Sequence, residues 1–116
     1  FPYTTLFRSA SPDQPIAELS GGNQQKVVLG KWFLTEPRIL LLDEPAAGCN
    51  AVETEEIDHL IAEVAKSGVA ILLVEQYFEF ARDLADHFAV MDRGEVVLAG
   101  SKAGMVEADV RKFLTV

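Results

Sequence analysis

Short, uninterrupted apolar runs alternate with helical patterns along this chain, and this alternation constrains its fold more than any other feature. Four aliphatic residues precede Asp43, a second run covers 69–74, and a third covers 88–91. Runs of this kind are typical of strands buried on both faces of a parallel sheet. Patterns of helical spacing at 21–35 and 52–66 separate or precede these strands. The alternation predicts an α/β layer fold with a mostly parallel sheet and flanking helices.

The remaining elements complete this expectation. A short helix is predicted at 78–85 and a terminal helix at 106–113, while Arg93 and Gly94 form a turn into 95–99. Such a turn between two apolar runs predicts a C-terminal antiparallel β-hairpin. Two helical faces are expected to pack on the sheet. Their apolar residues are Val28, Leu29, Trp32 and Phe33 in the first helix and Ile57, Leu60, Ile61, Val64 and Ala65 in the second.

Composition narrows the class of protein. The 116 residues correspond to about one domain, and 18 acidic against 10 basic residues give a net charge of −8. This excess of negative charge repels a phosphate backbone, so we expect no nucleic-acid partner. The single cysteine, Cys49, excludes an internal disulfide framework and fits a reducing compartment. No apolar run reaches the roughly 20 residues that a spanning helix needs, so we expect a cytoplasmic protein.

Residues 1–9, Phe-Pro-Tyr-Thr-Thr-Leu-Phe-Arg-Ser, show no clear helical or strand periodicity. They resemble the translation of a sequencing adapter. We therefore expect this segment to be a scar, residues 10–116 to be the C-terminal part of one domain, and the natural protein to begin further upstream.

Two segments carry groups that suit phosphate chemistry. Ser20, Gly21 and Gly22 open a helix, where free N–H groups and the helix dipole favour an anion. An ordinary serine N-cap explains the same residues. Asp43 and Glu44 end the first strand, where one carboxylate can hold Mg²⁺ and the other can face a water. A solvated strand end is the alternative for this pair.

Taken together and in this order, these segments resemble the ATP-binding cassette (ABC) ATPases. Leu19–Val27 is similar to their signature motif, Ile39–Pro45 to their Walker B strand, and Ala46–Asn50 to the D-loop that follows. Gly68–Glu75 is similar to the strand that leads to their switch residue. The resemblance runs from about Ala17 to the C-terminus and implies an incomplete P-loop NTPase fold.

The resemblance also implies roles for single residues. The signature residues Ser20, Gly21, Gly22 and Asn23 would contact the γ-phosphate of ATP held by a second ATP-binding subunit. Asp43 would position Mg²⁺, and Glu44 would be the general base that polarises the attacking water. Asn50 would lie at the dimer seam.

Gln76 stands where most of the family has a switch histidine. Glutamine can donate a hydrogen bond to the γ-phosphate but cannot become cationic, so its stabilisation of the transition state would be weaker or differently organised. His59 and His87 lie elsewhere and are expected to have no catalytic role. The acidic cluster of Glu53, Glu55, Glu56 and Asp58 is expected to be a solvated helix face.

The Walker A pattern G-x-x-x-x-G-K-[ST] does not occur in the 116 residues. This pattern supplies the backbone cradle and the lysine for the phosphates. The chain alone is therefore expected not to bind or hydrolyse ATP, and its open sheet edge is expected to favour aggregation.

The resemblance implies permease partners at the inner face of a membrane, but its finer features point to three importer classes. Residues 19–34 are similar to ribose-type sugar importers, 46–56 to branched-chain amino-acid importers, and 76–81 and 113–116 to urea importers. The C-terminal half favours urea or branched-chain amino acids, with a ribose-type importer as the alternative. An assembly chimera, a soluble ABC ATPase without a transport role, and a non-catalytic interaction fragment are further alternatives.

Overall fold

A computed structural model of the chain describes residue 11 and residues 13–114, so the segment 1–9 lies outside the described residues. The chain divides into two compact units, Phe1–Glu75 and Gln76–Val116. The helices and strands are α1 (Gly21–Phe33), β1 (Ile39–Asp43), α2 (Ala51–Lys66), β2 (Ala70–Val74), α3 (Phe78–Leu84), β3 (His87–Asp92), β4 (Glu95–Ser101) and α4 (Glu107–Leu114), with short 3-10 turns at Ile16–Glu18 and Lys102–Gly104. Each of the predicted strands and helices is present, with ends that differ by one or two residues.

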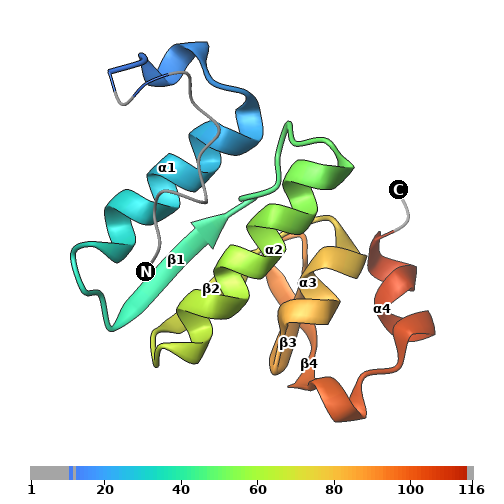
Figure 1. Cartoon of the computed structure of the whole chain (residues 1–116). Helices are drawn as coiled ribbons and strands as arrows, with labels where there is room; N and C mark the ends of the chain where they lie inside the picture. Colours follow the sequence, from blue (N-terminus) through green and yellow to red (C-terminus); the bar gives the residue numbers. More distant parts are fainter. Residues whose placement is uncertain (1–10, 12, 115–116) are drawn as a thin grey trace. The chain divides into compact units, whose positions relative to one another are not determined.

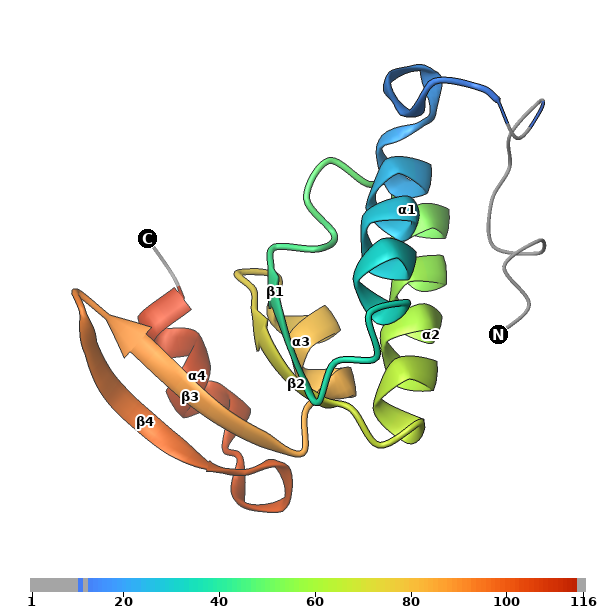
Figure 2. The ribbon, with the colours of Figure 1, turned by 90° about the vertical axis from the view of Figure 1, so that its left-hand side faces the viewer.

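In the first unit, β1 and β2 form a parallel pair in which Leu40 lies opposite Ile71 and Asp43 lies opposite Val74. Helices α1 and α2 lie side by side along one side of this pair (Figures 1 and 2). Parallel strands need a long crossover, and α2 provides it between β1 and β2. The parallel α/β arrangement predicted for this part of the chain is therefore confirmed.

The prediction that these strands are buried on both faces is wrong for this structure. Leu40 is only 7% exposed, whereas Leu41 is 70% exposed and Leu72 is 56% exposed. Side chains alternate between the two faces of a strand, and within this unit the helices cover one face alone. The core of the unit lies between that face and α2, whose Ile57, Leu60, Ile61 and Val64 are buried as predicted.

The buried face of α1 also differs from the prediction. Val28 is 47% exposed and Trp32 is 54% exposed, while Lys26 and Leu29 are almost fully buried. The buried residues Gly22, Asn23, Lys26, Leu29 and Gly30 recur at helical spacing. The prediction is confirmed for Leu29 and wrong for Val28 and Trp32, because the buried side of α1 also includes glycines and a lysine that is paired with Glu56.

The second unit contains the predicted hairpin. Strands β3 and β4 are antiparallel, with Asp92 opposite Glu95. Arg93 and Gly94 join them with φ values of 49° and 85°, which both residues of a type I′ turn require. β3 was expected to be a third strand of the parallel sheet; among the described residues its partner is β4 instead. Phe78 of α3, Val90 of β3 and Val110 of α4 form the buried core of this unit.

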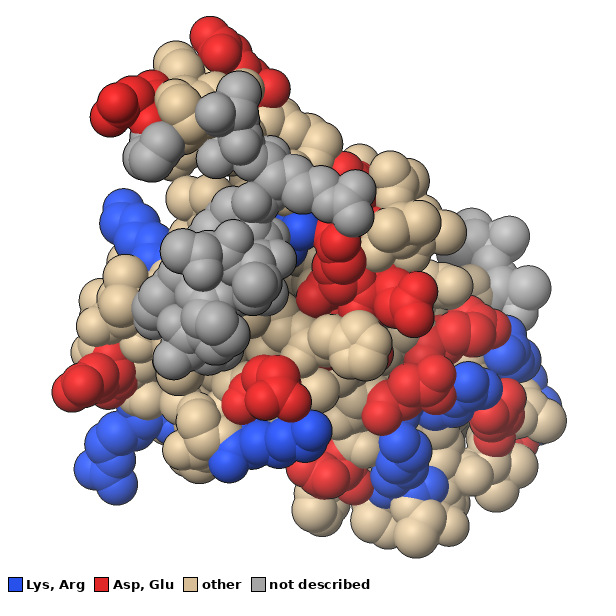
Figure 3. Space-filling model, in the orientation of Figure 1, with Lys and Arg blue, Asp and Glu red and all other residues tan. Residues whose placement is uncertain are grey.

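The surface carries charged side chains of both signs. On the face drawn in Figure 3, acidic side chains are interspersed with Lys and Arg. Within residues 11 and 13–114, no helix combines the length and the apolar character that crossing a bilayer requires.

Candidate functional site

The N-terminus of α1 carries the first group of predicted residues. Ser20 is the N-cap: its Oγ accepts a hydrogen bond from the Asn23 backbone N–H at 3.3 Å, and its carbonyl accepts from Gln24 N at 2.9 Å. Ser20 and Gly21 are exposed, whereas Gly22 and Asn23 are buried. The structure therefore confirms the serine cap and brings the four signature residues together in one turn.

Gly22 is held tightly against the start of α2. A Cβ atom at Gly22 would lie 2.5 Å from Cβ and 2.7 Å from Cδ of Glu53. A Cβ at Gly21 would lie 3.2 Å from the carbonyl oxygen of Gly48. A side chain at Gly22 would therefore require Glu53 to move. The two helix N-termini and the loop between β1 and α2 thus meet at one end of the first unit.

Asn50, predicted to lie at a dimer seam, caps α2 in this structure. Its Oδ1 accepts from the Glu53 backbone N–H at 2.9 Å, and its own backbone N–H donates to Glu53 Oε2 at 3.1 Å. The two bonds form a capping box, which satisfies donors that a helix N-terminus leaves unpaired. The seam itself stays a prediction.

The acidic cluster on α2 is only partly the solvated face that the sequence indicated. Glu55 is exposed, but Glu56 forms an ion pair with Lys26 in which Lys26 Nζ and Glu56 Oε2 are 2.5 Å apart. The Lys26 side chain is 3% exposed and that of Glu56 is 35% exposed. Sequence reasoning missed this pair. The one sequence pattern that indicates burial of Lys26 is its spacing, because it stands four residues after Gly22 and so lies on the same face of the helix.

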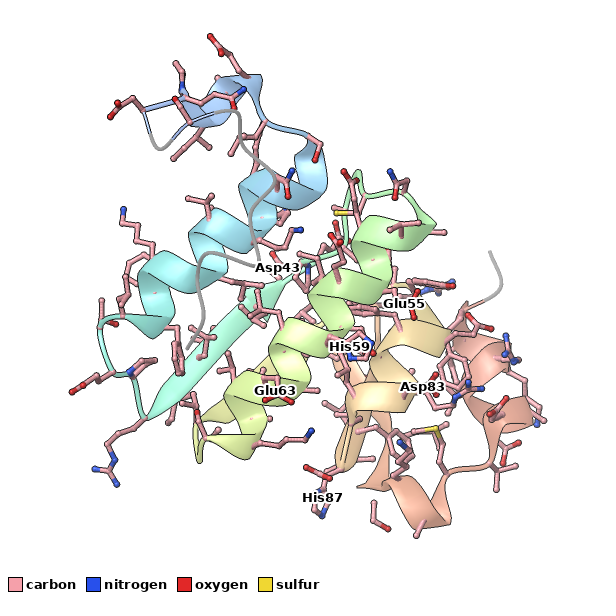
Figure 4. The ribbon with its side chains drawn as sticks, in the orientation of Figure 1. Asp43, Glu55, His59, Glu63, Asp83 and His87 are labelled. Carbon is pink, nitrogen blue, oxygen red and sulfur yellow. The ribbon has the colours of Figure 1, made fainter. Side chains whose placement is uncertain are left out.

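Asp43 and Glu44 lie at the carboxyl end of β1, as predicted, and Figure 4 shows Asp43 at the tip of this strand. Asp43 is exposed and Glu44 is half-buried. The strand ends at Asp43, and Glu44 has a φ of 45°, in the left-handed region that costs a non-glycine residue roughly 1–2 kcal/mol. The alternation of side chains along a strand therefore does not determine which way the Glu44 side chain points.

Two backbone hydrogen bonds fix this unusual conformation of Glu44. Its N–H donates to the carbonyl of Val74 at 2.8 Å, and its carbonyl accepts from Ala47 N at 2.9 Å. Backbone strain of this kind is found preferentially at active sites, where surrounding contacts hold it in place. The observation supports a functional role for this carboxylate.

Glu75 is a second residue that sequence reasoning missed. Its Oε1 accepts a hydrogen bond from the Ala46 backbone N–H at 3.3 Å, which ties the loop after β1 to the end of β2. The signal was present in the sequence, because Glu75 follows an apolar strand just as Asp43 ends one.

Gln76 follows directly and is the first residue of the second unit, where it is exposed. The structure thus brings Asp43, Glu44 and Glu75 to one end of a parallel strand pair, and leaves the switch role of Gln76 a prediction. His59 lies on α2 and His87 begins β3 (Figure 4).

The carboxylate of Asp43 fits Mg²⁺. It is a hard oxygen ligand, exposed at the end of its strand, and Mg²⁺ in phosphate-binding sites is held by one or two carboxylates together with phosphate oxygens and water. In the part of the chain that is described, no three His, Cys, Asp or Glu residues are grouped as a metal cluster. A metal at Asp43 would therefore depend on the substrate for most of its ligands.

Cys49 lies in the loop between β1 and α2, and its thiol does not have the character of a nucleophile. Burial, and then the nearby Glu53 carboxylate, raise the pKa of its thiol above the ordinary value, while Lys26 acts in the opposite direction. A raised pKa disfavours the thiolate that reacts.

Comparison with known proteins adds independent findings. The profile of the ABC transporter family matches residues 4–47. A ribose import ATP-binding protein of Geobacillus kaustophilus is 37% identical over 108 residues, which are 93% of this chain and 22% of that protein. A protein of Agrobacterium fabrum named for ribose, galactose and methyl galactoside import is 44% identical over 79% of this chain and 18% of its own length. The chain thus spans about a fifth of these relatives.

Solved structures agree on the fold. A nucleotide-free ATP-binding cassette from an ABC transporter matches with a TM-score of 0.70 and 27% identity, over 84% of this chain and 37% of that one. A cassette solved as a dimer with ADP and Pi matches with a TM-score of 0.73 and 22% identity, over 89% of this chain and 45% of that one. These matches confirm the α/β fold. The relatives named above support the ribose-type alternative and give no support to the urea or branched-chain amino-acid assignment.

Proposed function

We propose that this segment of an ABC transporter ATP-binding domain takes part in ATP hydrolysis that drives the import of a small solute. The observation that carries the proposal is the carboxylate pair Asp43 and Glu44 at the carboxyl end of two parallel strands, where α/β folds bind their ligands. The left-handed backbone of Glu44 adds weight, because two hydrogen bonds hold a conformation that the residue does not favour.

The two carboxylates have different surroundings and different proposed tasks. The exposed Asp43 holds Mg²⁺, which when bound neutralises charge on the phosphate oxygens. The half-buried Glu44 accepts the proton of the water that attacks the γ-phosphate. Gln76 orients the γ-phosphate by donating a hydrogen bond from its side-chain amide.

The N-terminus of α1 has a different proposed role. Ser20, Gly21, Gly22 and Asn23 contact the γ-phosphate of ATP bound by a second ATP-binding subunit, with the positive end of the helix dipole directed at the phosphate. Asn50 lies at the seam between the two subunits. The dimeric cassette with ADP and Pi supports an assembly of this kind.

The solute is proposed to be a ribose-type sugar, and the partners to be permease subunits at the cytoplasmic face of a membrane. The printed names of the two relatives support this choice. The test is the ATPase rate of the reconstituted transporter. Ribose with its binding protein should raise the rate, and urea or leucine should not; stimulation by urea or leucine alone would reverse the assignment.

The hydrolysis proposal is tested with Glu44→Gln in the longer ATP-binding protein that carries this sequence. Loss of a positioned general base is expected to lower the rate of hydrolysis about 100-fold or more, with ATP still bound. Glu36→Gln is a matched control, since Glu36 also has a left-handed backbone, with a φ of 52°, but lies before β1. An equal rate for wild type and Glu44→Gln would contradict the role of Glu44.

A further inference from the structure

The turn formed by residues 44–47 follows β1 and begins with the left-handed Glu44. Its closing bond joins the Ala47 backbone N–H to the carbonyl of Glu44, with nitrogen and oxygen 2.9 Å apart. Pro45, the second residue, is buried and has no N–H to donate. The N–H of Ala46 is therefore the one backbone donor in the middle of the turn that needs a partner from elsewhere.

The side chain of Glu75 provides that partner from the end of the neighbouring strand. Its Oε1 accepts a hydrogen bond from the Ala46 backbone N–H at 3.3 Å, between residues 29 positions apart in the chain. The carbonyl of Val74, one residue earlier, accepts the Glu44 N–H at 2.8 Å. Each backbone N–H of the turn is thus paired, and two of them are paired with residues 74 and 75.

These two contacts hold a backbone conformation that Glu44 does not favour. Its φ of 45° is one that a non-glycine residue keeps only where surrounding contacts determine it. The bond from Val74 acts on the first residue of the turn, and the bond from Glu75 acts two residues later. One hydrogen bond leaves a turn free to pivot about it, whereas a second one fixes its orientation. Glu75 and Ala46 are both half-buried, which limits the competition of water for their bond.

We propose that Glu75 is a positioning residue for Glu44: its carboxylate fixes the turn 44–47 and thereby directs the Glu44 side chain toward the water that it activates. The inference rests on the proposed function, which makes Glu44 the general base. In this role Glu75 touches neither the phosphate nor the water. Two properties follow: an uncharged acceptor oxygen at position 75 is sufficient, and the effect of Glu75 on the rate requires the carboxylate of Glu44.

Two substitutions in the longer ATP-binding protein test the first property. Glu75→Ala removes the acceptor, whereas Glu75→Gln keeps a side-chain oxygen that can accept the same bond. We expect Glu75→Ala to lower kcat about tenfold with little change in the KM for ATP, because a misplaced general base slows the reaction without removing a binding contact. Glu75→Gln should keep most of the wild-type kcat. Glu55→Ala, at an exposed carboxylate of α2, is the matched control and should keep the wild-type rate.

Hydrogen–deuterium exchange gives a readout that does not depend on catalysis. It is measured on the peptide that contains residues 44–47 of the same longer protein. Loss of the acceptor for the Ala46 N–H should make exchange of this peptide faster in Glu75→Ala than in the wild type. Exchange in Glu75→Gln and in Glu55→Ala should stay close to that of the wild type.

A double variant tests whether Glu75 acts through Glu44. Glu75→Ala is combined with Glu44→Gln, and the rate of a single turnover is compared with that of Glu44→Gln alone. The two rates should be equal, because the orientation of residue 44 no longer matters once its carboxylate is gone. A further loss of about tenfold in the double variant would show that Glu75 acts separately, and it would overturn the positioning role.

The remaining outcomes separate this inference from the proposed function. A wild-type rate in Glu44→Gln would contradict the proposed function and the positioning role together. A large loss in Glu44→Gln beside a wild-type rate in Glu75→Ala would overturn the positioning role alone. Equal losses in Glu75→Ala and Glu75→Gln would show that the charge is required, which also overturns that role. The same exchange in all the chains would show that Glu75 does not hold the turn.

Discussion

The two units of this chain are stabilised in different ways. Both units enclose buried apolar residues, but the first unit also depends on polar and glycine contacts between its helices: the buried Lys26 pairs with Glu56, and Gly22 lies against Glu53. The second unit is built on an aromatic residue, Phe78, whose ring packs with Val90 and Val110. The predicted site residues other than Gln76 lie in the first unit.

The difference shows where a fold departs from simple hydrophobic packing. Around Phe78, charged residues remain at the surface: Arg111 lies 4.8 Å from the ring centroid and pairs with Glu79 at 2.7 Å. At the start of α1, by contrast, a lysine is buried and, at the end of β1, a glutamate has a left-handed backbone. The buried lysine occurs in the unit that carries the carboxylate pair, as expected where function and packing compete. Left-handed residues occur in both units, because Arg93 of the second unit also has a positive φ.

The largest effect is expected from Phe78→Ala. Removing a buried aromatic side chain should lower the free energy of unfolding by about 4 kcal/mol, because it leaves a cavity that the surroundings fill only in part. Urea unfolding measures this value. The control is Phe113→Ala in the same unit, because Phe113 is 39% exposed. Similar losses for both variants would contradict the apolar core assigned to this unit.

Next in size is Glu56→Gln in the first unit. It leaves the buried Lys26 without its ionised partner, so we expect the free energy of unfolding to fall by about 2 kcal/mol. This is less than for a fully buried pair, because the Glu56 side chain is 35% exposed. The same measurement on Glu79→Gln should show no resolved change, since that pair with Arg111 is at the surface. If the two variants lost the same stability, the contrast between the units would fail.

A smaller effect on stability is expected at Glu44, where the backbone conformation can be tested separately from the carboxylate. Glu44→Gly should be more stable than Glu44→Ala by about 1 kcal/mol, because glycine adopts the φ of 45° without strain. Thermal unfolding of the two chains gives the difference. Neither variant should support ATP hydrolysis in the longer protein. A more stable alanine variant would argue against the left-handed backbone.

The smallest expected effect is the change of stability at acidic pH. Hydrogen bonds from Arg111 and Arg82 lower the pKa values of the Glu79 and Asp83 carboxyls, and the nearby Ser20 hydroxyl lowers the pKa of Glu53. A lowered folded-state pKa contributes stability above the unfolded-state value of about 4, and this contribution is lost as pH falls through the lower folded value. The urea midpoint should therefore decrease below about pH 4.

Glu79→Gln should flatten this decrease slightly, and added salt should weaken the part that comes from surface pairs. A urea midpoint that rose on acidification from pH 7 to pH 3 would contradict the assigned directions of the pKa shifts.

Much of the fold followed from the sequence, because strand runs, the Arg93–Gly94 turn and the apolar spacing of α2 act locally. The buried side of α1 followed only at Leu29, because the Lys26–Glu56 pair joins residues on different helices and buries a charged residue that hydrophobicity does not select. The positions of Asp43 and Glu44 at a strand end were predictable. The left-handed backbone of Glu44 and the contact of Glu53 with Gly22 were not, since they depend on how distant segments pack.

The proposed division of ATP hydrolysis between the two adjacent carboxylates is examined by comparing Asp43→Asn with Glu44→Gln in the longer ATP-binding protein. Binding of ATP with Mg²⁺ and the rate of a single turnover are measured separately for each variant. We expect Asp43→Asn to weaken the Mg²⁺-dependent part of ATP binding, whereas Glu44→Gln should bind ATP normally and lose about 100-fold or more in the rate of turnover. Loss of the same quantity in both variants, or of neither, would contradict it.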